Sequence, residues 1–253
     1  AAFKAYLPAD NRDKLGGIEK ALGKLGWNLG AGEFKDQDWS TKWKAGLKPI
    51  RVTSKGVPII VKPTWKKASK RPGDIVIEID PGMAFGTGGH ATTKMCLKAI
   101  LDVIKGGKVV LSRSSILDVG TGTGVLAIAA RKLKVGKALG IDIDKVALSV
   151  ARKNARHNRA EVRISGAAVE NVKGRFSIVA ANILAGELIR LSAAIRERVS
   201  PGGYLVLSGI LCEEAESVKE AYSKEGLRFV KAYSTPEWSA LLFQGPPERP
   251  SGR

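Results

Sequence analysis

The stretch Ile116–Gly124 constrains the fold of this chain more than any other part of the sequence. It reads ILDVGTGTG, so an apolar segment is followed by glycines at three alternate positions, and the apolar run VLAIAA comes directly after it. Glycine lacks a Cβ, which lets the backbone take positive φ values and approach a ligand closely. The N-terminus of a helix presents free N–H groups that favour an anionic group. The stretch therefore predicts a buried strand, a ligand-binding loop at Gly120, Gly122 and Gly124, and a helix.

The spacing of these glycines argues against a dinucleotide as the ligand. A dinucleotide fingerprint places its third glycine five residues after the first, where the helix packs closely on the strand. Counted from Gly120, that position is Val125. The segment Ala138–Asp142 has the pattern of the next strand and ends in an acid, which is where an acceptor for a ribose diol is needed. Loop and acid together resemble the first motifs of class I S-adenosylmethionine methyltransferases, and a nicotinamide-dependent dehydrogenase is the least favoured alternative.

Strand and helix patterns alternate through the rest of the chain after residue 115. Alternation of this kind is typical of a doubly wound α/β fold, in which a mostly parallel sheet carries helices on both faces. The last two strands have no helix between them, which predicts an antiparallel hairpin at the edge of a seven-stranded sheet. The expected strands are Ile116–Val119, Ala138–Asp142, Val162–Ile164, Phe176–Asn182, Tyr204–Ser208, Arg228–Tyr233 and Trp238–Phe243. The expected helices follow Gly124 and cover Lys145–Asn158, Ala185–Val199 and Glu213–Glu225.

The N-terminal part of the chain has a different pattern. The apolar spacing predicts helices at Asp10–Trp27 and Asp38–Ala45, and β segments at Arg51–Thr53, Val57–Val61 and Ile75–Ile79. We therefore expect a small basic segment with a linker at residues 1–72, a catalytic domain at residues 73–245 and a flexible tail at residues 246–253.

Net charge is unusual in this chain, which carries 42 Lys and Arg against 24 Asp and Glu, a formal charge of +18. Residues 1–72 hold 16 Lys and Arg against 6 Asp and Glu. Such an excess is typical of proteins that work near nucleic acid or a nucleoprotein, although a solvated basic surface is the alternative.

No apolar run reaches the roughly 18 residues of a membrane helix, and no signal-peptide pattern opens the sequence, so we expect a cytoplasmic protein. Cys96 and Cys212 lack metal-ligand spacing, and no metal site is expected.

A second glycine-rich loop spans Asp80–Thr93 and reads DPGMAFGTGGHATT. Apolar positions after it form one broad helical face through Ile104, for which Thr92 or Thr93 is the expected N-cap. The composition of its glycine-rich part, residues 82–89, suits a lid over a bound ligand.

Three motifs beyond the glycine loop carry a more specific resemblance. They are FGTGGHATT at Phe85–Thr93, ANILAG at Ala181–Gly186 and SGIL at Ser208–Leu211. Together with residues 118–124 and Gly140–Asp144, they resemble the bacterial ribosomal protein L11 methyltransferases, the PrmA family, over about residues 38–243.

The resemblance implies a Rossmann-like class I methyltransferase fold, preceded by a small α/β domain that recognises the ribosomal protein. The sequence ahead of Trp39 is shorter than that domain usually is. The resemblance also implies S-adenosylmethionine as cofactor and ribosomal protein L11 as partner, methylated on its α-amine and on lysine ε-amines. We expect a monomer whose basic surface can contact ribosomal RNA. Carried over by motif, the cofactor contacts are Thr93, Gly120, Asp142 and Asn182, and Asp118, Gly122 and Gly124 complete the cofactor site.

Asn182 and His90 are the candidate catalytic residues. A sulfonium methyl group is already electrophilic, so the protein must mainly place a neutral amine in line with it. A free lysine has a pKa of about 10.4 and must first lose a proton. The side-chain carbonyl of Asn182 can orient the amine, although an Asn after a strand can also simply stabilise a turn. His90 can relay a proton or hold the loop shut, and the alternative is a purely structural histidine.

Two other functions stay open on the sequence alone. One keeps the cofactor but changes the target to another protein lysine or to RNA, for which the basic N-terminal segment is the reason. The other is a ribosome- or RNA-binding protein whose methyltransferase fold has lost catalysis. The intact glycine loop, Asp142 and Asn182 argue against that loss.

Overall fold

The computed structural model describes residues 14–28, 30, 46–80, 82, 89–107 and 110–247. The chain divides into two compact units, Ala1–Gly46 and Leu47–Arg253. In the first unit, helix α1 spans Leu15–Gly23, which confirms the core of the helix expected at Asp10–Trp27. Its described C-terminal end lies four residues earlier than expected. The helix expected at Asp38–Ala45 lies outside the described residues.

The second unit is built on a seven-stranded sheet with the order β6-β5-β4-β7-β8-β10-β9. Its strands are β4 (Ser115–Val119), β5 (Lys137–Ile141), β6 (Arg163–Ser165), β7 (Phe176–Asn182), β8 (Val199–Leu211), β9 (Arg228–Ser234) and β10 (Trp238–Gln244). Strands β4 to β8 run parallel, and β10 pairs antiparallel with both β8 and β9. The structure thus confirms the doubly wound sheet and its antiparallel edge hairpin.

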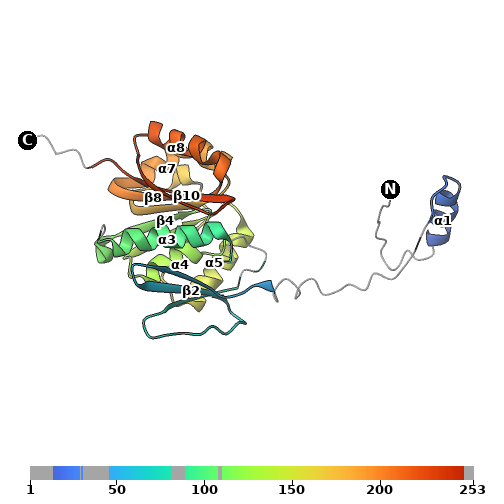
Figure 1. The fold of residues 1–253 in the computed structure, drawn as a ribbon, viewed down its shortest axis with the longest axis horizontal. Coiled ribbons are helices and arrows are strands. Elements are labelled where there is room, and N and C mark those ends of the chain that lie inside the picture. Colours follow the sequence, from blue (N-terminus) through green and yellow to red (C-terminus); the bar gives the residue numbers. More distant parts are fainter. Residues whose placement is uncertain are drawn as a thin grey trace, which may run out of the picture. The chain divides into compact units, whose positions relative to one another are not determined.

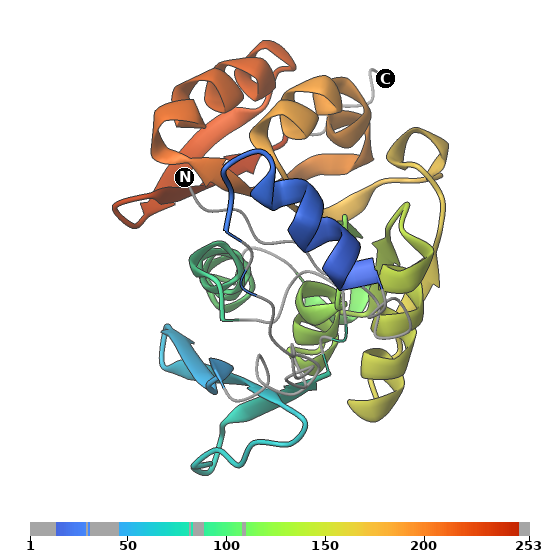
Figure 2. The same ribbon diagram turned by 90° about the vertical axis from the view of Figure 1, so that its right-hand side faces the viewer.

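Helices cover both faces of this sheet, as Figures 1 and 2 show. One face carries α3 (Ala91–Lys105), α4 (Val125–Lys132) and α5 (Lys145–His157). The other face carries α6 (Ala185–Arg190), α7 (Ser192–Arg198) and α8 (Ala215–Lys224). Short 3₁₀ helices lie at Leu111–Arg113, Val169–Asn171 and Cys212–Glu214. None of the helices in the described part of the chain is long and apolar enough to cross a membrane.

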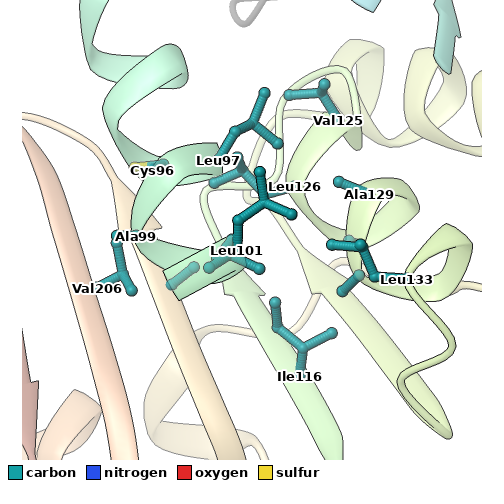
Figure 3. Packing of buried hydrophobic residues seen from close by; sticks show 14 of the residues in the cluster. Cys96, Leu97, Ala99, Leu101, Ile116, Val125, Leu126, Ala129, Leu133 and Val206 are labelled. Atoms are coloured by element: carbon teal, nitrogen blue, oxygen red, sulfur yellow. The ribbon is translucent and has the colours of Figure 1, made fainter. Parts of the chain in front are cut away.

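Each face of the sheet has its own apolar core. On the α3–α5 side, Leu97 and Leu101 of α3 point toward Leu126 of α4 above Ile116 of β4 (Figure 3). All four side chains are at most 3% exposed, so the helices are held by burial of apolar surface. This packing keeps α3 and α4, whose N-termini flank the glycine loops, in place against the central strand.

A small three-stranded sheet packs on the same core. Its strands are β1 (Ile50–Ser54), β2 (Val57–Pro63) and β3 (Ile75–Ile79), with β1 antiparallel and β3 parallel to β2. Ile59 and Ile77 are fully buried in the core that contains α3 and α4. The boundary expected between residues 72 and 73 falls inside this sheet, whereas the compact units divide between Gly46 and Leu47.

Several element boundaries differ from those expected from the sequence, and three of the differences stand out. The helix expected at Ala185–Val199 is two helices, because Leu191 takes ψ of 8° and interrupts the helical backbone. Strand β8 begins at Val199, because Phe176 pairs with Val199 before the register shifts. Helix α3 begins at Ala91, two residues before Thr93.

Candidate functional site

The glycine loop joins β4 to α4 at the centre of the sheet. The backbone angles φ of Gly120, Gly122 and Gly124 are 67°, 53° and 84°, in the left-handed region that favours glycine. At Gly120 the space is restricted as well, because an added Cβ would lie 2.4 Å from Cγ2 of Ile183. The loop has therefore no room for a side chain at its first glycine, and its shape is the one expected of a ligand cradle.

Asp118 holds this loop from inside. Its buried Oδ2 accepts hydrogen bonds from the Thr121 hydroxyl at 2.7 Å and from the Ala127 amide at 3.2 Å. Burial is the main cause that raises the pKa of the Asp118 carboxyl to about 7, partly offset by the two hydrogen bonds. The structure thus places Asp118 as a brace between the loop and α4, and its contact with a cofactor stays a prediction.

Asp142 follows β5 and reaches across to the glycine loop. Its Oδ2 accepts from the Gly122 amide at 2.9 Å, and its Oδ1 accepts from the Asp144 amide at 3.0 Å. Gly140 makes this approach possible, because a Cβ there would lie 2.7 Å from the Thr121 hydroxyl oxygen. Each carboxylate oxygen has a second lone pair, so the fixed carboxylate remains able to accept hydrogen bonds from a ribose diol.

Asn182 lies at the end of β7, next to β4 in the sheet. Its Nδ2 lies 3.4 Å from the hydroxyl oxygen of Thr93, which is fully buried near the start of α3. Its Oδ1 is buried and has no hydrogen-bond partner among the described residues. A buried polar atom left unpaired destabilises a fold by about 1–3 kcal/mol, so each such atom in a native protein needs an explanation, of which a catalytic role is one. The free oxygen of Asn182 is the clearest such atom at this edge of the sheet.

His90 is the N-cap of α3. Its Nδ1 lies 2.8 Å from the Thr92 hydroxyl oxygen and accepts from the Thr92 amide at 3.4 Å. Its ring meets the ring of Trp238 edge-on, with 4.9 Å between centroids. The expectation that Thr92 or Thr93 caps α3 is therefore wrong, since the extended backbone at His90 starts the helix earlier. A catalytic role of His90 stays a prediction, and the lid expected at residues 82–89 lies mostly outside the described residues.

Ile183 is a site residue that the sequence analysis did not single out. Its side chain closes over Gly120, and its amide donates to the Ser208 carbonyl at 3.1 Å. Gly209 has φ of 84°, and a Cβ there would lie 2.3 Å from the Ile183 carbonyl oxygen. Ile183 thus ties the ANILAG and SGIL motifs to the glycine loop. The sequence contains both motifs, but neither motif indicates that Ile183 contacts the glycine loop.

The residues at this edge fit S-adenosylmethionine. Asp142 offers a fixed acceptor for a ribose diol, and the glycine loop leads into the N-terminus of α4, which suits a carboxylate. The unpartnered Oδ1 of Asn182 is an acceptor that the protein itself does not use. The structure brings together Gly122 with Asp142, and Thr93 with Asn182. That these four residues contact the cofactor stays a prediction.

Comparison with known proteins agrees with this geometry. The family model described as ribosomal protein L11 methyltransferase (PrmA) matches residues 4–246. The chain is 46% identical over 220 residues to the ribosomal protein L11 methyltransferase of Geotalea uraniireducens, which covers 83% of this chain and 69% of that protein. It is 40% identical over 247 residues to the one from Geotalea daltonii, covering 95% of this chain and 76% of the relative.

A solved structure shares the architecture. The ribosomal protein L11 methylase from Lactobacillus delbrueckii subsp. bulgaricus superposes with a TM-score of 0.68 and 26% identity. The match covers 78% of this chain and 98% of that protein.

Proposed function

Because the chain belongs to the family of ribosomal protein L11 methyltransferases (PrmA), we propose that it transfers methyl groups from S-adenosylmethionine to amino groups of ribosomal protein L11. It is a methyltransferase, and its cofactor is S-adenosylmethionine. The proposed acceptors are the N-terminal α-amine and lysine ε-amines, and the proposed compartment is the cytoplasm.

The observation that carries the proposal is the free Oδ1 of Asn182. It is a buried acceptor at the end of a central strand, beside Thr93 and next to the strand that carries the glycine loop. An acceptor of this kind suits the N–H of an incoming amine, because a hydrogen bond from that N–H turns the nitrogen lone pair away from the acceptor. Asn182 cannot act as a strong base, so its proposed role is to orient the amine.

S-adenosylmethionine, when bound, supplies a methyl group that is electrophilic because it is carried on a positively charged sulfur. The protein's own residues have three tasks around it. Asp142 accepts from the ribose diol, and the loop with Gly120 and Gly122 gives the cofactor close access to backbone. Asn182 holds the amine for attack. Desolvation at this edge of the sheet favours the neutral amine over the ammonium form, which lowers the pKa of a bound lysine amine from about 10.4.

The direct test is intact-protein mass spectrometry of purified ribosomal protein L11 after incubation with this protein and S-adenosylmethionine. We expect mass gains in steps of one methylene, and peptide mapping then identifies the modified amines. The Asn182→Ala variant, still able to bind the cofactor, is the matched control and should give much slower gains. If ribosomal protein L11 gains no mass while the cofactor binds, the acceptor assignment is wrong, and other protein lysines and RNA become the substrates to assay.

A further inference from the structure

In the second unit, groups of acidic and basic residues lie at opposite ends of strands β4 to β6. Asp118, Asp142 and Asp144 lie at the carboxyl ends of β4 and β5, where the candidate site is. The opposite edge, where helices end and strands begin, includes the α4–β5 and α5–β6 connections at residues 131–137 and 156–163. These two connections hold seven Lys and Arg residues and a single acid. The edge opposite the candidate site is therefore strongly basic.

The two connections enclose an open hollow. It has a volume of about 470 Å³ and is lined by Arg131, Lys132, Lys134, Arg159, Ala160 and Glu161. A second hollow of about 400 Å³ lies beside it and shares Lys132, but the lysines there, Lys70 and Lys132, are accompanied by two acids, Asp74 and Glu78. The basic surface is therefore the first hollow, and the second hollow carries both signs of charge.

Most of the positive charge in the first hollow is not neutralised by the protein. The only acid there, Glu161, is paired with Arg131 at 2.8 Å. Arg131 also donates to the carbonyl oxygens of Val135 and Gly136, so its guanidinium holds the connection in shape. Lys132, Lys134 and Arg159 form no ion pair with any residue that the structure describes, and Lys134 and Arg159 are exposed. Three cations therefore face a shared space without a counterion from the protein.

The backbone conformation at two of these residues favours glycine, so the basic side chains there are not explained by backbone preference. Lys134 has φ of 73° and Arg159 has φ of 50°, and both follow the C-terminal end of a helix. Glycine is the residue that suits this left-handed position best. Cations near a helix C-terminus do offset the helix dipole, but that effect acts within the last turn, where Arg131, Lys132 and Arg156 already lie. Long basic side chains thus stand at positions where the backbone by itself favours glycine.

We propose that this basic edge binds the phosphate backbone of RNA. Exposed, unpaired Lys and Arg side chains around an open hollow match a chain of phosphates, whose binding depends on charge and not on base identity. An anionic membrane is a poorer match, because membrane-binding surfaces combine cations with exposed apolar side chains. Among the described residues, the exposed large apolar side chains lie outside both connections. Because the surface lies opposite the candidate site, RNA bound there leaves the site open to a protein amine.

The test uses the full chain and a fluorescein-labelled 20-base-pair RNA duplex, with affinity measured by fluorescence anisotropy at several KCl concentrations. In the variant Lys134→Gly/Arg159→Gly we expect affinity at low salt to fall about tenfold. The slope of log K against log [KCl] should become shallower by about 1.5 to 2, as expected when two phosphate contacts are lost. Glycine suits both backbone positions, so the melting temperature should be unchanged or raised.

The matched control is Lys55→Gly/Lys98→Gln. Lys55 also has positive φ, 47°, but lies in the β1–β2 turn, and Lys98 lies exposed on α3, so this variant loses the same charge elsewhere on the unit. It should bind the duplex nearly as the unmodified protein does. Equal losses in both variants, or no loss in the first, would overturn the proposal. Tighter binding to phosphatidylglycerol vesicles than to the duplex would also overturn it. Methylation of ribosomal protein L11 should be the same in both variants, which keeps this test separate from that of the proposed activity.

Discussion

The backbone amide of Gly122 donates a hydrogen bond of 2.9 Å to Oδ2 of Asp142. The residue that follows β5 thus supports the glycine loop that follows the neighbouring strand β4. The two residues are 20 apart in the chain, and parallel pairing of β4 with β5 places them side by side. The same carboxylate oxygen that braces the loop is an acceptor available to a ligand. If Asp142 also binds the ribose, as we propose, loop shape and ligand binding are coupled through this residue.

Replacing Asp142 separates these two roles. Asp142→Ala removes the loop contact and the proposed acceptor for a ribose diol, and we expect affinity for S-adenosylmethionine to fall at least tenfold in isothermal titration calorimetry. Asp142→Asn keeps an oxygen that accepts from Gly122 but places an NH2 group against the Asp144 amide, so it should lower the melting temperature less than Asp142→Ala does while still weakening binding. Near-normal affinity in Asp142→Ala would exclude Asp142 as the ribose acceptor.

Gly120→Ala should damage the site through one close contact and through backbone strain. The new Cβ would meet Cγ2 of Ile183 at 2.4 Å, and Ala is strained at φ of 67°. We expect a loss of about 2–4 kcal/mol in the free energy of unfolding, together with loss of cofactor binding. Gly174→Ala is the control, because Gly174 has φ of 87° but no atom within 4 Å of an added Cβ. It should lose only about 1 kcal/mol and keep cofactor binding.

A second variant identifies the contact. Adding Ile183→Ala to Gly120→Ala removes the atom that the new Cβ would meet, so part of the lost cofactor affinity should return. If the double variant binds no better than Gly120→Ala alone, the contact with Ile183 is not the cause of the damage.

Asn182→Ala should slow methyl transfer more than it weakens cofactor binding. The variant loses the buried Oδ1 that we propose orients the amine, and it also loses the long contact with Thr93. Turnover in single-turnover assays should fall at least tenfold, with the dissociation constant for S-adenosylmethionine changed by less. Thr93→Val removes only the hydroxyl on the other side of that contact, so a similar loss of turnover there would assign the effect to the contact and not to Oδ1.

The buried carboxyl of Asp118 should make stability depend on pH. Burial is the chief cause that raises its pKa in the folded chain from the ordinary value of 3.8 to about 7. Between these values the unfolded chain releases the proton and the folded chain keeps it. The free energy of unfolding should therefore fall as pH rises from about 4 to about 7, by at most about 4 kcal/mol, and then level off.

Asp118→Asn removes this titration and keeps an oxygen that accepts from Thr121 and Ala127. Urea unfolding from pH 4 to pH 8 should show the wild-type protein losing stability relative to the variant as pH rises. Parallel curves for the two proteins would mean that Asp118 does not titrate in this range.

The local pattern of the sequence was enough for most of the fold. Three glycines on alternate positions after an apolar run indicated a strand, a turn and a helix, since positive φ at those positions depends on the residue type itself. The alternation of strand and helix patterns correctly predicted the seven-stranded sheet, because burial of one face of each element requires that periodicity. Ends of elements were less well predicted, as at β8, where pairing of Phe176 with Val199 extends the strand through a Pro-Gly-Gly segment.

Tertiary structure decided which of the candidate residues meet. The Thr93 hydroxyl is a plausible helix cap from its position in the sequence, but packing of α3 against the sheet directs it toward Asn182, 89 residues later. The fit of Ile183 over Gly120 is likewise invisible in the sequence, because it depends on the distance between two neighbouring strands.

By itself, then, the sequence determined the order of elements, the shape of the glycine loop and the acid at the end of the next strand. These properties follow from backbone preferences and periodicity within a few residues. The tertiary structure alone decided that Asp118 faces inward as a brace, that Oδ1 of Asn182 is buried without a partner among the described residues, and that Lys134 and Arg159 share one hollow. Burial, hydrogen-bond partners and shared surfaces depend on residues far apart in the chain, which only the packing of the sheet and its helices brings together.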